Sequence, residues 1–365
     1  MAEKKIKIGL IGCGAIASYR HLPVIVKHPD CELYAIAEVN QERLDVIGEQ
    51  FNVPKERRFT DYHELLALPE IDAVTVSTRV EQHYGVVMSA CMARKHVLCE
   101  RPLAATVAQG WEMVDAARQN NVFLVNNLPN RLEDASRLMF DYIQEGRIGK
   151  VQVVRLIFLW WGPSNEKRFG QIRSRRDYLM EEGGGPIFDS GVHFFDLARV
   201  LAGSEYRDIY AVGQWVETQY TNPDHVISTC VFENNVIGLI EQGWVYSDEN
   251  KRKNVLQRIE VIGSEGTLLN EWKWDIHEQR YLGNYVYLNT PTQYEEKRFE
   301  IETSFSRIYT YFTQMILEGK CPPEVPTGED GIIAMEAALK ALDDSRRNRY
   351  AKSEVMRDMS RYWVT

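Results

Sequence analysis

A glycine turn near the start of the chain is the feature that most constrains its fold. The hexapeptide Gly12-Cys13-Gly14-Ala15-Ile16-Ala17 follows an apolar run from Ile6 to Ile11 and opens a segment with helical spacing. A strand that passes into a helix over such a turn is typical of the first unit of a doubly wound α/β sheet. There Gly12 permits the tight bend, Gly14 lets a ligand phosphate approach the backbone, and Ala17 lets the helix pack closely on the strand. The turn therefore predicts a dinucleotide site that includes Gly12, Gly14, Ala15 and Ile16, with the first N–H groups of the helix facing the pyrophosphate.

The alternation of short apolar runs and helical patterns continues through the first 127 residues. Further strands are predicted at residues 32–37, 73–77, 96–99 and 122–125, and helical spacing occurs at residues 85–93 and 107–118. Strands that alternate with helices in this way indicate a parallel sheet. We therefore expect a Rossmann-type domain over residues 1–127.

The rhythm changes after residue 127. A helix is predicted at residues 132–145 and a long strand at 151–160; another helix follows Gly183-Gly184-Gly185, and several strand-like segments lie between residues 209 and 288. Two helices, at 304–318 and 329–347, follow them. This order predicts an α+β domain over residues 128–365 with a large, mostly antiparallel open sheet. Because an exposed sheet face is costly, we expect a homo-oligomer that forms through that sheet.

Polar residues follow several of the predicted strands. Glu38 ends the second strand, about 20 residues after the glycine turn, where a carboxylate binds the ribose hydroxyls of NAD and repels the 2'-phosphate of NADP. NAD is therefore the expected cofactor, although a glycine turn beside an unrelated surface glutamate remains an alternative. Thr78, His83 and Asn127 also follow strand ends, where loops reach the ligand. For His83, a helix-cap or surface position is equally compatible with the sequence.

Composition excludes several classes of partner. The chain has 365 residues and a net charge of -9, which argues against a nucleic-acid-binding surface. Its six cysteines form no CxxC pair, so neither a disulfide framework nor a metal site is expected, and a reducing cytoplasm fits best. No apolar run approaches the roughly 20 residues of a membrane span. A small-molecule substrate is the default expectation.

Three further motifs carry a family resemblance. They are Glu100-Arg101-Pro102 after the fourth strand, the segment from Gly183 to His193, and Thr327-Gly328-Glu329-Asp330-Gly331. With the glycine turn, they make nearly the whole chain resemble the Gfo/Idh/MocA oxidoreductases. That resemblance implies a Rossmann domain joined to a sheet domain, a nicotinamide cofactor held in part by Glu100 and Arg101, and a sugar or cyclic polyol substrate.

The resemblance also implies the catalytic residues. The family's Asp and His, spaced four apart, correspond to Asp189 and His193, whereas the lysine of its Glu-Lys-Pro motif is replaced here by Arg101. His193 is the expected general base, because imidazole has an ordinary pKa near the working pH. Asp189, on the same face of a helix, would bind the substrate hydroxyl or orient the imidazole. Arg101 cannot exchange protons at neutral pH, so we expect it to bind substrate or cofactor oxygens and to stabilise the developing alkoxide charge. A buried histidine and aspartate that only pack a helix remain the alternative.

Tryptophan and arginine side chains suggest where a substrate would bind. Trp160 and Trp161 end the long strand and lead into a basic stretch that contains Arg176. Indole faces suit stacking on sugar rings, so these three residues and Asn127 are candidate substrate contacts. Aromatic core residues beside a solvated loop are an equally good interpretation.

The sequence therefore predicts an NAD-dependent dehydrogenase that acts on a ring CH–OH of a sugar, cyclic polyol or glycoside, with C3 as one position. Two other functions remain open. One is a glycosidase that retains its NAD and uses transient oxidation, and the other is a non-catalytic sugar sensor, which the loss of the motif lysine favours. Retention of Asp189 and His193 argues against the sensor.

Overall fold

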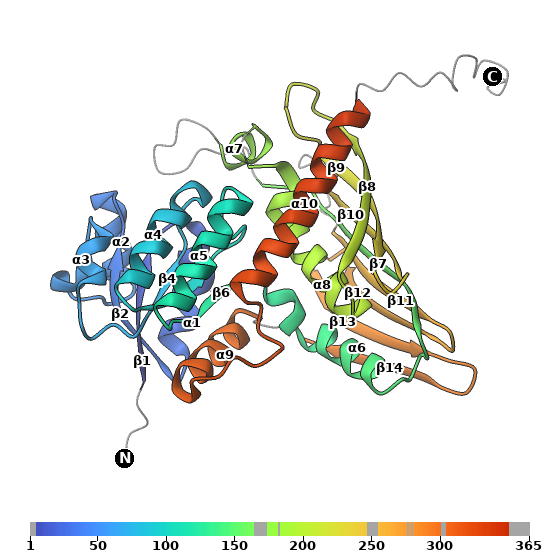
Figure 1. Ribbon diagram of the computed structural model, residues 1–365, viewed down its shortest axis with the longest axis horizontal. Helices are drawn as coiled ribbons and strands as arrows, with labels where there is room; N and C mark the ends of the chain where they lie inside the picture. The colour runs from blue at the N-terminus through green and yellow to red at the C-terminus, as the bar shows by residue number, and fades with distance from the viewer. Residues whose placement is uncertain are drawn as a thin grey trace.

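The structure is a computed structural model that describes residues 5–163, 174–181, 183–246, 255–275, 277–278, 280–300 and 304–349. It contains two sheets, a six-stranded one in the N-terminal part and an eight-stranded one in the C-terminal part. Figure 1 shows them side by side, each with its own helices. The predicted fold class, a Rossmann sheet followed by an α+β domain, is confirmed.

The N-terminal sheet is parallel throughout and has the strand order β3-β2-β1-β4-β5-β6. Its strands are β1 (Ile6–Ile11), β2 (Cys31–Ala37), β3 (Arg58–Phe59), β4 (Ala73–Val76), β5 (His96–Cys99) and β6 (Leu124–Asn126). The helices between them are α1 (Leu22–Lys27), α2 (Gln41–Gln50), α3 (Tyr62–Leu66), α4 (Val80–Met92) and α5 (Val107–Gln119). The strand order reverses between β1 and β4, and ligands of such sheets bind at the carboxyl ends of the strands beside that point.

The C-terminal sheet is antiparallel except for the pair β7 and β10, which run parallel. Its order is β14-β13-β12-β11-β7-β10-β9-β8. The strands are β7 (Val151–Leu159), β8 (Tyr206–Gln214), β9 (His225–Phe232), β10 (Ile237–Gly243), β11 (Leu256–Gly263), β12 (Thr267–Asp275), β13 (Arg280–Asn289) and β14 (Tyr294–Phe299).

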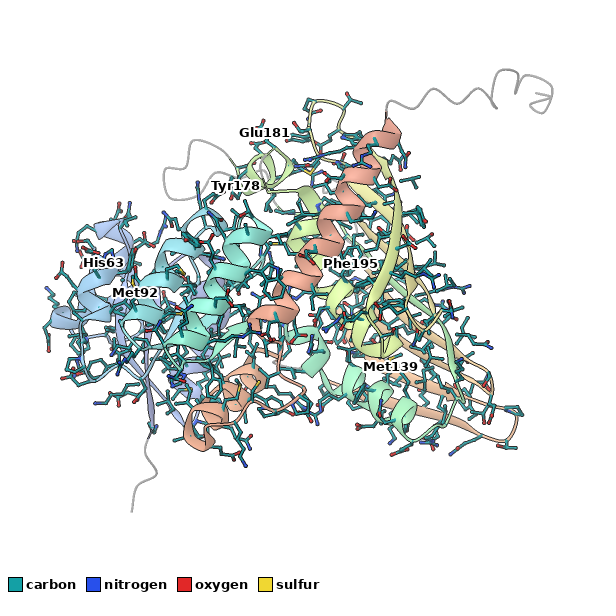
Figure 2. The ribbon with its side chains drawn as sticks, in the orientation of Figure 1. His63, Met92, Met139, Tyr178, Glu181 and Phe195 are labelled. Carbon is teal, nitrogen blue, oxygen red and sulfur yellow. The ribbon has the colours of Figure 1, made fainter. Side chains whose placement is uncertain are left out.

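Among the described residues, helices cover one face of this second sheet. Side chains of α6 (Asp134–Gln144), α8 (Val192–Ala202) and α10 (Gly328–Arg349) share one apolar core with it. Figure 2 labels Met139 of α6 and Phe195 of α8, both of which lie in that core. On the other side Tyr210, Val212 and Ile227 are exposed. The open sheet face that the sequence predicts is therefore present.

One helix of the C-terminal part packs on the N-terminal sheet. Ile308, Tyr309 and Phe312 of α9 (Ser304–Glu318) are buried in the same core as Ile8 and Leu10 of β1. The division of the chain at residue 127 remains a prediction. The core around β1 contains side chains from both sides of that division, because residues 304–325 also contribute to it. This helix therefore ties the far end of the chain to the N-terminal domain.

Sequence periodicity located most elements to within a few residues but missed others. The missed elements are α2, α3, β3, β14 and α7 (Arg175–Glu181). Most of the basic stretch, residues 164–173, lies outside the described residues. Within the described ranges, no helix has the length and apolar character that crossing a bilayer requires.

Candidate active site

A cleft of about 1730 Å³ lies between the two domains and is lined by both. Its floor is formed by the glycine turn after β1 and by the residues that follow β2, β4 and β5, and its far wall comes from the second domain. Pockets for one drug-sized ligand usually measure roughly 300–1,000 Å³. The cleft therefore has room for a dinucleotide together with a substrate.

The glycine turn has the geometry that a dinucleotide requires. Gly12 has φ +94°, and a Cβ atom there would lie 2.8 Å from the backbone nitrogen of Thr78, so no side chain fits. A Cβ atom on Gly14 would have no protein atom within 4 Å, which leaves open space above the turn. Ala17 is fully buried against the strand. All four predicted turn residues line the cleft, namely Gly12, Gly14, Ala15 and Ile16.

Glu38 lies at the expected end of β2 and is buried in the cleft wall. One carboxylate oxygen, Oε2, accepts a hydrogen bond from the backbone N–H of Cys13 at 2.9 Å, and Oε1 accepts one from that of Asn40 at 3.0 Å. Arg43 Nη1 lies 3.6 Å from Oε2. The carboxylate is thus locked beside the glycine turn, and a carboxylate in that place accepts ribose hydroxyl hydrogens.

Thr78 and His83, two further predicted cofactor residues, differ in position. Thr78 lines the cleft, but His83 does not. His83 is buried on α4, and its ring nitrogens lie within hydrogen-bond distance of the carbonyl oxygens of Pro102, Leu103 and Thr78. It joins two loops of the site from behind, so the structure supports neither a surface position nor a direct ligand contact for His83.

Arg101 and Asp189 form an ion pair across the cleft. Arg101 Nη1 donates to Asp189 Oδ1 at 2.9 Å, and Arg101 Nε lies 4.0 Å from Glu100 Oε2. Asp189 belongs to a π-helical turn, Ile187–Gly191, that continues into α8 with His193 in its first turn. Such widened turns inside helices often occur at functional sites. Asp189, His193 and Arg101 all line the cleft, so the structure brings the three predicted catalytic residues together.

Burial and charge set the protonation of this site. Burial raises the pKa of Glu100, but His21, Arg101 and Asn127 outweigh it and lower the value to about 2. Burial and the Arg101 cation lower the pKa of His193 to about 3, against the opposing effect of Glu100 and Asp189. Burial and the Arg101 cation therefore keep the His193 imidazole neutral at physiological pH, and its role as the general base stays a prediction.

The far wall of the cleft is aromatic. Phe158 of β7 stacks on Phe194 at 5.5 Å between ring centroids, and it meets Trp272 of β12 edge to face at 6.5 Å and Trp160 at 6.1 Å. Gln257 of β11 pairs with Phe158 in the sheet register and also lines the cleft. We call Phe158, Trp160, Gln257 and Trp272 the substrate wall. Sequence reasoning found only Trp160, because the others come together through strand pairing.

Three predicted substrate contacts do not line the cleft. Asn127 is buried and donates to Glu100 Oε1 at 2.6 Å, so it supports the site from behind. Trp161 lies next to Trp160 but outside the cleft lining. Arg176 is buried among Glu217 and Asp224, with its guanidinium over the ring of Trp244. Its charge is therefore used inside the second domain.

Helix α7 crosses from the second domain to the first beside the cleft. The Tyr178 hydroxyl donates to Glu81 of α4, and the guanidinium of Arg79 lies 5.2 Å from the Tyr178 ring centroid. Figure 2 labels Tyr178 and Glu181 on this helix. Arg79, Glu81 and Tyr178 all line the cleft. The described residues contain no group of three or more His, Cys, Asp or Glu side chains arranged to hold a metal ion.

Comparison with known proteins identifies the family. The model of an oxidoreductase family with an NAD-binding Rossmann fold matches residues 6–128, and the model of the GFO/IDH/MocA C-terminal domain matches residues 137–269. The chain belongs to the Gfo/Idh/MocA oxidoreductase family. Together the two models cover most of the chain, as the resemblance of its motifs predicted.

Relatives within this family act on polyols and sugars. The chain is 28% identical over 357 residues to a myo-inositol 2-dehydrogenase of Thermotoga maritima, which covers 93% of this chain and 97% of that protein. A levoglucosan dehydrogenase in complex with NADH matches with a TM-score of 0.77 at 22% identity, over 94% of this chain and 98% of that one. A 3-ketoreductase from Actinomadura kijaniata, in complex with TDP-benzene and NADP, matches with a TM-score of 0.72 at 22% identity, over 94% and 97%. Structural neighbours thus hold either dinucleotide.

Proposed function

We propose that this protein is an NAD-dependent dehydrogenase that oxidises a ring hydroxyl of a sugar, cyclic polyol or glycoside, with His193 as the general base. The observation that supports it most is that the glycine turn, the Arg101–Asp189 pair, His193 and the substrate wall all face one cleft. The relatives named above agree with a carbohydrate substrate.

NAD fits the first half of the cleft. The open space over Gly14 gives the pyrophosphate its place, and Glu38 lies where the adenosine ribose would bind. A 2'-phosphate would meet the Glu38 carboxylate, so NAD is the proposed cofactor in preference to NADP. When bound, the nicotinamide accepts a hydride from the carbinol carbon.

The side chains of the site handle the proton and the developing charge. Arg101, which is permanently charged, stabilises the alkoxide that forms as the hydroxyl proton is removed and that becomes the carbonyl when the hydride leaves. Its charge lowers the pKa of a hydroxyl bound beside it as well as that of His193, so donor and acceptor shift in the same direction. Neutral His193 takes the hydroxyl proton, and Asp189 accepts a hydrogen bond from the same substrate.

The substrate wall suits a carbohydrate ring. Trp160, Phe158 and Trp272 present apolar ring faces, and Gln257 provides an amide that both donates and accepts hydrogen bonds. Sugars combine apolar C–H faces with hydroxyl edges, so they match such a surface. Asn130 and Glu133 supply further polar groups at this end of the cleft.

The test mixes the protein and NAD with a panel of sugars, cyclic polyols and glycosides while the absorbance of reduced nicotinamide and the mass of the products are recorded. Net NADH with a keto product supports the proposal, and product analysis shows whether C3 is the position oxidised. Bond cleavage without net NADH would indicate the NAD-retaining glycosidase, and binding alone would indicate a sensor.

Two variants assign the roles. We expect His193→Ala to abolish turnover, whereas Arg101→Lys keeps much of it because a cation remains beside Asp189. His225→Ala is the control, because His225 lies outside the cleft lining and pairs with Glu241 on the second sheet. Near wild-type activity of His193→Ala would rule out His193 as the base.

We further propose a cytoplasmic homo-oligomer that forms through the exposed face of the second sheet. The apolar surface at Tyr210, Val212 and Ile227 supports this, since contiguous exposed apolar side chains mark contact sites. Light scattering of the purified protein tests it, and a monomer at all concentrations would contradict it.

A further inference from the structure

A chain of buried hydrogen bonds leads from the core of the first domain to the catalytic arginine. His21, which follows the glycine turn, is completely buried. Its Nε2 atom lies 2.9 Å from Glu100 Oε1, and its Nδ1 atom lies 2.9 Å from the Tyr309 hydroxyl of α9. Both nitrogens of the imidazole are thus committed to neighbours that are themselves buried.

This series of hydrogen bonds ends inside the protein. The Tyr309 hydroxyl lies 2.9 Å from Thr75 Oγ1 on β4, and both side chains are fully buried. A path for protons would need an outlet to water, and a buried threonine hydroxyl does not provide one. The arrangement is therefore a fixed support that joins η1 (Ala17–His21), β4 and α9 to Glu100.

At its other end the series of hydrogen bonds fixes the position of Arg101 through Glu100. Glu100 Oε2 accepts a hydrogen bond from the backbone N–H of Arg101 at 3.0 Å, and the same atom lies 4.0 Å from Arg101 Nε. The Arg101 guanidinium in turn donates a hydrogen bond to Asp189. The orientation of Arg101 thus depends on a carboxylate that is itself held by His21 and Asn127.

We propose that His21 is a positioning residue, which holds Glu100 as a fixed, ionised carboxylate and so keeps Arg101 aimed at Asp189 and the substrate. His21 does not line the cleft and is completely buried behind it, so it acts through Glu100 and not by contact with a ligand. Its kinetic consequence rests on the proposed dehydrogenase activity, whereas its coupling to Glu100 does not.

Protonation of Glu100 is what the support prevents. Burial by itself raises the pKa of this carboxyl. The titratable and polar groups around it are His21, Asn127, Arg101, His83, Cys99, His193 and, through His21, Tyr309. Without His21, the hydrogen bond that contributes most to lowering the pKa of Glu100 is lost. Glu100 would then take up a proton in mild acid, and Arg101 would lose one of its two carboxylate partners.

Variants at two positions of the chain test this role. His21→Leu removes both hydrogen bonds, His21→Gln keeps an amide that can donate to Glu100, and Tyr309→Phe removes only the hydroxyl. The matched control is His28→Leu: His28 is also buried beside α9, where its Nε2 lies 2.9 Å from Thr310 Oγ1, but it does not reach Glu100.

The kinetic readouts are kcat, KM for NAD and the pH profile of kcat/KM. We expect His21→Leu to lower kcat at least tenfold, with KM for NAD changed less than about threefold and a new loss of activity in acid as Glu100 protonates. His21→Gln should restore most of kcat, Tyr309→Phe should show a smaller loss in the same direction, and His28→Leu should leave the profile unchanged. Equal losses in the two His21 variants without a change of profile would overturn the proposal.

A second readout needs no substrate. His21→Leu is compared in the wild-type and the Glu100→Gln background by its midpoint of unfolding in urea. We expect the shift to be clearly smaller when Glu100 is already neutral, and equal shifts would overturn the coupling. If His21→Leu does not fold, the same comparison with Tyr309→Phe decides. If no substrate is oxidised by the wild type, the proposed function fails while this comparison still tests His21.

Discussion

The lowered pKa of His193 makes the stability of the protein depend on pH in a way that can be calculated. The pKa falls from 6.5 to about 3 in the folded protein, first through burial and then through Arg101. In the unfolded chain the imidazole is hydrated and its pKa returns to about 6.5. Between these two pKa values the unfolded state binds a proton that the folded state does not. The contribution of His193 to the free energy of unfolding is therefore fully present above pH 6.5 and is lost as the pH falls toward 3.

The magnitude follows from the pKa difference. At pH 5, about one and a half pH units below the unfolded pKa, the cost is about 2 kcal/mol, since each unit corresponds to about 1.36 kcal/mol. Replacing His193 with Gln supplies a neutral amide that binds no proton in either state. We therefore expect His193→Gln to lose about 2 kcal/mol less than the wild type when the pH is lowered from 7.5 to 5.

Urea unfolding followed by tryptophan fluorescence at both pH values measures this difference. Comparing each protein with itself cancels the baseline cost of the substitution, and subtracting the two losses cancels the other titrating groups. The control His63→Gln repeats the substitution at a histidine whose side chain is 61% exposed (Figure 2). The prediction concerns the change with pH and not the baseline cost of the substitution at pH 7.5. Equal losses for the wild type and His193→Gln would refute a neutral, buried His193.

The remaining predictions address the cofactor, the substrate wall and a buried ion pair of the second domain. The wild type should use NAD at least about tenfold more efficiently than NADP in kcat/KM, and Glu38→Ala should narrow that ratio by removing the repelling carboxylate; comparable efficiencies in the wild type would contradict this. Gly14→Val should weaken NAD binding, measured by fluorescence titration, by about 100-fold or more with little change in the unfolding midpoint, because its Cβ would meet ligand and not protein. Trp272→Ala should raise KM for the substrate severalfold and change kcat less, since it removes an apolar binding surface and no acid, base or charged group; an equal loss in kcat would show that Trp272 also takes part in the chemistry. Arg131→Ala should cost about 3–5 kcal/mol in urea unfolding, because it leaves the buried Asp196 carboxylate without its guanidinium partner.

Local patterns allowed much of the fold to be predicted. The helix at 304–318 and the strands at Ile6–Ile11 and His96–Cys99 have the predicted bounds, because their periodicity and turn residues are encoded by neighbours in the chain. The short helix Arg175–Glu181 was missed because its apolar residues, Tyr178, Leu179 and Met180, are consecutive and show no helical spacing.

The candidate site residues likewise divide into those that local sequence patterns identify and those whose role depends on tertiary contacts. Gly12, Gly14 and Glu38 could be predicted because strand, turn and helix adjoin in sequence, and Arg101, Asp189 and His193 because motifs carry them. Arg176 also looked like a ligand contact, yet its guanidinium pairs with Asp224, 48 residues away. Nothing local distinguishes an arginine that binds substrate from one that neutralises a buried acid.

The sequence by itself determined that the chain forms a nucleotide-binding α/β domain followed by a sheet domain, and that it carries an arginine where a lysine was expected. Tertiary structure alone decided what surrounds that arginine. Arg101 meets Asp189, 88 residues away, while Glu100 is held through His21 by Tyr309, a further 288 residues along from His21. The substrate wall likewise exists only because β7, β11 and β12 pair in one register. Turns and periodicities depend on adjacent residues, whereas the pKa of His193 and the orientation of Arg101 depend on which distant side chains packing brings within a few ångströms.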